Sequence, residues 1–130
     1  MNHIGNFSVE GAPRGWKIEQ KNGRTALNPN ASIFRSKLRD AARKTFPKAK
    51  TLSVAKEFEL VIHLYQYYDK DFNTPGKSEQ IPDIDHIETL VMNALEGIIY
   101  VTDIQVASLS AHRWHCKEDE ERIQVNIYEI

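Results

Sequence analysis

The segment Pro82-Asp-Ile-Asp-His-Ile-Glu-Thr-Leu-Val-Met-Asn-Ala-Leu-Glu-Gly97 carries the clearest structural pattern in this 130-residue chain. Apolar residues recur at the spacing of one helix face, at Ile87, Leu90, Val91, Ala94, Leu95 and Ile98. Gly97 stands where a helix commonly ends in a left-handed residue. The segment therefore predicts an amphipathic helix that covers an apolar surface, and we expect a short strand over 98–102 to follow it.

Two carboxylates stand at the start of this helix. Pro82 favours an extended chain before it, and residues i and i+2 of an extended segment share a face, so Asp83 and Asp85 are expected to point to one place. Capping offers a second explanation, because Asp85 and Glu88 have the form of a capping box with Asp85 as N-cap. Capping explains Asp85 but leaves Asp83 without a role.

Asp103 is a third candidate carboxylate for this site, because of the lengths expected for the helix and for the strand that follows it. A helix of about eleven residues advances roughly 16 Å, and a strand over 98–103 would return about 17 Å. Helix and strand together would place Asp103 beside Asp83 and Asp85. Three converging carboxylates repel unless a divalent cation neutralises them, and oxygen ligands suit Mg²⁺ or Mn²⁺. Such a site suits phosphodiester cleavage.

The remaining pattern predicts a small mixed fold. We expect strands over about 7–11, 55–68, 105–114 and 123–127, and a second helix over 32–46. A polar connection over 14–31 contains turn signals at Asn22-Gly23 and Asn28-Pro29, and a loop is expected over 69–81. The expected fold class is α/β (α+β), with a mixed sheet packed by two main helices. A chain of 130 residues is long enough for one such domain over 1–130.

The charge is divided unevenly along the chain. Residues 1–56 carry a net charge of +9 and residues 57–130 a net charge of −10, although the total is only −1. A basic half can contact phosphates, whereas the alternative is a dipolar surface with no partner. The helix over 32–46 carries a stripe of basic residues, Arg35, Arg39 and Arg43. This stripe either binds a polyanion, which would offset the repulsion between its like charges, or is simply a solvated helix face. The DNA-binding candidates are Arg14, Lys17, Lys21, Arg24, Arg35 and Arg39.

The single cysteine, Cys116, excludes an internal disulfide and fits a reducing compartment. No apolar run approaches the roughly 20 residues that span a membrane. The first residues lack the basic and apolar regions of a secretory signal. We therefore expect a cytoplasmic protein that has no membrane partner.

The segment 82–97, followed by Tyr100-Val-Thr-Asp-Ile-Gln-Val106, resembles the RusA family of Holliday junction resolvases. The resemblance is strong over 82–106 and compatible elsewhere. It implies a homodimeric endonuclease that depends on Mg²⁺ (or Mn²⁺), nicks paired strands of four-way or branched DNA, and is often carried by phages and prophages. Carried over by position, Asp83, Asp85 and Asp103 are the implied catalytic and metal-binding residues.

Four positions depart from the family pattern. His86 stands where the family has asparagine, Asn93 where it has aspartate, and Thr102 where it has an acid. Thr89 replaces a lysine that is thought to help catalysis, so Arg14 or Lys17 is the candidate replacement if their connection folds over the site. The alternative function is a RusA-like junction-binding module with weak or no cleavage. The third interpretation is a small protein-interaction domain in which the acidic residues only cap helices and interact with water.

Two other groups of residues each allow a functional and a structural interpretation. His112, His115 and Cys116 offer three zinc ligands, but no second pair completes the four that a structural site needs, so we expect no zinc site. The tyrosines at 65, 67 and 68 suit either stacking on bases or packing in a strand.

Overall fold

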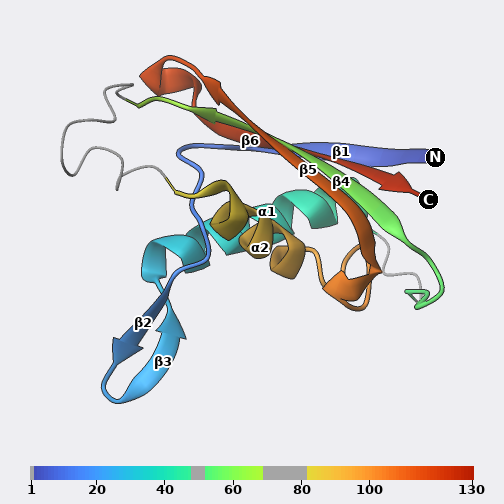
Figure 1. The fold of residues 1–130 in the computed structure, drawn as a ribbon, viewed down its shortest axis with the longest axis horizontal. Coiled ribbons are helices and arrows are strands. Elements are labelled where there is room, and N and C mark those ends of the chain that lie inside the picture. The colour runs from blue at the N-terminus through green and yellow to red at the C-terminus, as the bar shows by residue number, and fades with distance from the viewer. Residues whose placement is uncertain (1, 48–51, 69–81) are drawn as a thin grey trace.

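The computed structural model describes residues 2–47, 52–68 and 82–130, and its centre is a four-stranded mixed sheet (Figure 1). The strand order is β1-β6-β4-β5, in which β4 pairs parallel with β5 and antiparallel with β6, and β1 pairs antiparallel with β6. The strands are β1 (Asn2–Glu10), β4 (Phe58–Gln66), β5 (Val106–His115) and β6 (Arg122–Glu129). The expected loop over 69–81 lies outside the described residues.

Two helices, α1 (Pro29–Thr45) and α2 (Ile84–Ala94), lie on the same side of this sheet (Figure 1). Strand β4 alternates between fully buried and half-buried residues, because one of its faces meets the helices. Each fully buried aliphatic side chain contributes about 1.5–3 kcal/mol. The core formed from the sheet and both helices includes Leu38, Leu60, Ile62, Leu64, Ile87, Leu90, Val91, Ile123, Val125 and Ile127. The expected mixed α+β single domain with two helices is thereby confirmed.

Both helices begin earlier than expected. The Asn28 side chain accepts hydrogen bonds from the N–H groups of Asn30 (2.9 Å) and Ala31 (3.3 Å), and Pro29 occupies the first helical turn. Asparagine followed by proline is therefore a helix start here and not a turn. Helix α2 has Asp83 as its N-cap, so Asp85 lies in the first turn and the predicted capping box is wrong.

The strand expected over 98–102 is absent, and the chain turns there instead. Gly97 adopts a left-handed φ of 79° and donates its N–H to the Tyr100 carbonyl (2.7 Å). Tyr100 is fully buried, and its hydroxyl donates to the Met92 carbonyl at 2.6 Å. Burial of this side chain against the end of α2 folds the chain back sharply. A short 3-10 helix, η2 (Asp103–Gln105), then leads into β5.

The connection expected over 14–31 contains a β-hairpin. Strands β2 (Ile18–Lys21) and β3 (Arg24–Leu27) pair antiparallel around Asn22 and Gly23, whose φ values of 53° and 74° suit the turn of a tight hairpin. The hairpin projects away from the sheet and helices (Figure 1). Its strands are exposed except at Leu27, which is partly buried against the core.

Within the described ranges, no helix has both the length and the apolar character needed to cross a membrane.

Candidate metal centre

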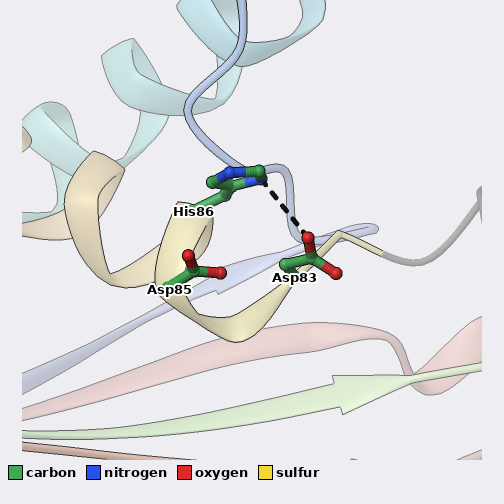
Figure 2. A group of neighbouring side chains, drawn as sticks. All are labelled: Asp83, Asp85 and His86. Carbon is green, nitrogen blue, oxygen red and sulfur yellow. Dashed lines mark ion pairs between the residues drawn. The ribbon is translucent and has the colours of Figure 1, made fainter.

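The first turn of α2 gathers two carboxylates and an imidazole. One ligand atom from each of Asp83, Asp85 and His86 lies within 4.8 Å of the others, and all three residues are exposed. Figure 2 shows the three side chains around the start of the helix, with His86 Nδ1 3.8 Å from Asp83 Oδ2. Asp83 and Asp85 thus come together as predicted, and His86 joins them. The i, i+3 spacing of Asp83 and His86 was the signal for this third ligand.

The sheet holds this turn from one side. Arg113 in β5 donates from Nη2 to the Pro82 carbonyl and from Nε to Gln66 Oε1 at 2.7 Å. Gln66, at the end of β4, is itself buried. The residue that precedes Asp83 is therefore anchored to the ends of two core strands, which restricts where the carboxylate can lie.

Residues 13–17, which we call the strap, hold the turn from the other side. The Trp16 N–H donates to the His86 carbonyl at 2.8 Å. A Cβ on Gly15 would lie only 2.8 Å from His86 Cβ, so the close approach requires glycine. This stretch of N-terminal chain, drawn in blue, passes beside His86 in Figure 2. The connection that carries Arg14 and Lys17 therefore does lie against the site.

Asp103 does not join the group. It lies beyond the C-terminal end of α2, where its N–H donates to Glu96 Oε1 at 3.2 Å. Asp83 caps the opposite end, and a helix of 11 residues is about 16 Å long. The helix-and-strand distance argument is wrong because residues 98–102 form a turn. Within one chain, Asp103 is separated from Asp83 and Asp85 by the length of α2.

Helix α2 contributes no positive charge to the group, because it contains neither lysine nor arginine. The Thr89 hydroxyl donates to the Asp85 carbonyl of its own helix at 2.9 Å, and it carries no charge. One turn along, partial burial and then the charge of Asp85 raise the pKa of Glu88. The helix therefore presents a negative surface at its first turn.

Two of the predicted DNA-binding residues connect the helices instead of lying free on the surface. Arg35 Nε donates to Asn93 Oδ1 at 2.6 Å, and Arg39 Nη1 donates to the carbonyls of Ala94 and Glu96, both at 2.8 Å. Partial burial, followed by the charges of neighbouring arginines, lowers the pKa of Arg39. Arg39 on α1 thus binds the carbonyls at the C-terminal end of α2. Neither polyanion binding nor a solvated face, the two interpretations of the sequence, included this structural role.

The other four candidates are free. In the described part of the chain, no hydrogen bond or ion pair engages the side chains of Arg14, Lys17, Lys21 or Arg24, and all four residues are exposed. Lys21 and Arg24 are also direct partners across the hairpin. Like charges directly opposite each other destabilise a β-pair, so the hairpin tip carries an unfavourable concentration of positive charge.

The histidines near the end of β5 stack with neighbouring rings. His63 and His112 have ring centroids 5.3 Å apart, and Trp114 Nε1 donates to His63 Nδ1 at 3.0 Å. Arg122 lies 3.9 Å from the ring centroid of Tyr65, so this tyrosine packs within the sheet. Among the described residues, no group of metal ligands includes His112, His115 or Cys116.

Comparison with known proteins gives one finding. The family model described as Endodeoxyribonuclease RusA matches residues 9–128. No curated protein matches the chain. The matched range includes the strap, the hairpin, both helices and most of the sheet.

Proposed function

The chain belongs to the RusA family of endodeoxyribonucleases, and on that premise we propose that it nicks paired strands of four-way DNA junctions with Mg²⁺ or Mn²⁺ as cofactor. The observation that carries the proposal is the exposed group formed by Asp83, Asp85 and His86. Two carboxylates and an imidazole that converge at one exposed point can share a bound cation, which offsets the negative charge. A cation-binding role explains why they lie together.

The three side chains fit a divalent cation. Carboxylate oxygens are preferred by Mg²⁺ and Mn²⁺, and an imidazole nitrogen is also accepted by Mn²⁺. Asp83, Asp85 and His86 would hold the cation, with their exposure leaving open positions for water and phosphate. A divalent cation there would polarise a phosphoryl oxygen and favour ionisation of an attacking water.

The remaining residues bind and orient the DNA. The backbone N–H groups at the start of α2 form the positive end of a helix dipole and suit an approaching phosphate. Lys17, Lys21 and Arg24 contact phosphates along the flanking arms, and such contacts provide most of the affinity for DNA. The basic hairpin projects away from the sheet and helices (Figure 1), so its exposed side chains are free to contact DNA.

We further propose that the active form is a homodimer and that Asp103 acts as a ligand only across its interface. Val101 and Ile104 flank Asp103 and are 46% and 85% exposed. A second copy that covered these apolar side chains would remove them from water. Ile104→Glu should therefore convert a dimer into a monomer with reduced nicking, as measured by sedimentation velocity. Unchanged sedimentation would exclude this surface as the interface.

The test of the proposed function uses a labelled four-way junction and a linear duplex of the same arm sequence. We expect paired nicks in the junction with Mg²⁺ or Mn²⁺, no nicks with EDTA, and weaker action on the duplex. Junction binding without nicking at any cation concentration would contradict cleavage and support the binding-module alternative. Absence of junction binding would contradict both.

A further inference from the structure

We propose that Arg14 is a catalytic residue that contacts the phosphate cleaved at the group formed by Asp83, Asp85 and His86. This inference rests on the proposed function and assigns the positive charge that the site itself lacks. A phosphate that approaches the first turn of α2 meets two carboxylates, with Glu88 close by, and α2 offers no basic side chain. The cation alone must then offset every negative charge unless another segment supplies one.

The strap is the segment that lies in the right place. Gly15 is in close contact with His86, and the Trp16 N–H is bonded to the His86 carbonyl at 2.8 Å. Pro13, on the other side of Arg14, is buried. Since consecutive Cα atoms are about 3.8 Å apart, the Arg14 backbone is fixed beside the residue that forms part of the group.

The guanidinium of Arg14 is also available. In the described ranges, every arginine except Arg14 and Arg24 makes a hydrogen bond, an ion pair or a ring contact; the engaged ones are Arg35, Arg39, Arg43, Arg113 and Arg122. Arg24 pairs with Lys21 at the tip of the hairpin, which projects away from the sheet and helices (Figure 1). Arg14 is therefore the free arginine whose backbone neighbours contact His86.

Arg14 suits this role better than Lys17. A guanidinium binds a phosphate through two parallel hydrogen bonds, whereas an ammonium acts as a point charge. The Lys17 carbonyl accepts the Asn28 N–H at 2.7 Å, which places Lys17 at the base of the hairpin. Arg14 is the direct neighbour of Gly15, the residue that touches His86.

The first experiment compares Arg14→Gln with Lys44→Gln, which removes the same charge from an exposed position at the end of α1. Nicking of a four-way junction is measured in single turnover at saturating protein and Mg²⁺. Arg14→Gln should slow nicking by roughly tenfold to thousandfold, the usual effect of losing one positioned charge, and Lys44→Gln should retain the wild-type rate. Equal rates for Arg14→Gln and the wild type would overturn the inference.

A second variant moves Arg14 without changing the charge. A Cβ at position 15 would lie 2.8 Å from His86 Cβ, so Gly15→Ala must change how the strap packs on the first turn of α2. We expect Gly15→Ala to slow nicking and to weaken junction binding as Arg14→Gln does, because both variants remove the same phosphate contact. The double variant Gly15→Ala/Arg14→Gln should be no slower than Arg14→Gln alone. Additive losses would show that the two residues act independently and would overturn the inference.

A binding measurement provides a readout that does not depend on turnover. Once the nick has been mapped, a junction with a neutral methylphosphonate at that position is titrated in EDTA. Arg14→Gln should weaken binding to the unmodified junction severalfold and have no effect on the modified one. An equal loss on both junctions would show that Arg14 contacts a different phosphate.

The outcomes separate the inference from the proposed function. If the wild type makes no cation-dependent nicks, the proposed function fails and this inference fails with it. If the wild type nicks and Arg14→Gln nicks equally fast, only the inference fails.

Discussion

The two ends of α2 differ in whether their polar groups are hydrogen-bonded within the fold. At the C-terminal end, Arg39 donates to the carbonyls of Ala94 and Glu96, and the Tyr100 hydroxyl donates to Met92. At the N-terminal end, the carboxylate of Asp83 makes no capping hydrogen bond and is 75% exposed. The polar groups at the C-terminal end are bonded within the fold, whereas the ionisable side chains at the N-terminal end are exposed and available for chemistry.

The N-terminal end also differs in how it is held. Its backbone is fixed by Arg113 from the sheet and by Trp16 from the strap, while its ionisable side chains stay exposed. A rigid backbone with free functional groups is the arrangement expected of a preorganised site. The side chains at the first turn of α2 are thus exposed although its backbone is anchored from two sides.

The largest expected effect comes from removing the carboxylates. Asp83→Asn and Asp85→Asn should each lower nicking by about a thousandfold or more, because each removes a charge that the cation requires. Junction binding should survive, since the basic residues are untouched. The Asp83 side chain makes no capping hydrogen bond, so urea unfolding of Asp83→Asn should match the wild type. Wild-type nicking by either variant would remove its carboxylate from the proposed site.

The variant Thr89→Lys tests whether a positive charge on α2 itself can replace that of Arg14. Side chains on a helix lean towards its N-terminus, so a lysine there can reach the group that Thr89 cannot. In the Arg14→Gln background, Thr89→Lys should restore nicking by about tenfold or more, measured in single turnover at saturating Mg²⁺. In the wild type, only a small gain is expected if Arg14 has the role that we propose for it. A large gain in the wild type would mean that the site normally lacks such a charge.

The C-terminal end should respond through stability. Arg39→Ala removes two charge-assisted hydrogen bonds to carbonyls and should lower the free energy of unfolding by about 1.5–3 kcal/mol. Urea denaturation measures this loss, and nicking by the protein that remains folded should be close to the wild-type rate. Unchanged stability combined with weaker junction binding would instead place Arg39 on the DNA surface, as the charge pattern predicted.

The smallest effect is expected at the hairpin tip. Lys21→Gln/Arg24→Gln removes two phosphate contacts and should reduce the slope of log affinity against log salt by about 2, because fewer counterions are released on binding. Unfolding should be unchanged or slightly improved, since the variant relieves a like-charged pair. An unchanged slope for junction binding would show that the hairpin faces away from the DNA.

Part of the fold and the site was predictable because it is encoded locally. The spacing of apolar residues identified both helices, and alternation identified the core strands β4 and β6, since one face of each element must be buried. Asp83 and Asp85 are two residues apart, and no long-range packing is needed to bring them together. The hairpin was missed although Asn22-Gly23 was recognised as a turn, because its strands are short and have no apolar face.

The sequence by itself thus determined the α+β class, the family, and the pair of carboxylates at the start of α2. Only the tertiary structure decided where Asp103 lies, because the direction of the chain after α2 depends on burying Tyr100 against that helix. Only the tertiary structure placed the strap on His86, since about 70 residues separate Gly15 from it and no local pattern encodes that contact. Local spacing sets which side chains share a face, whereas the packing of distant segments sets which charges meet.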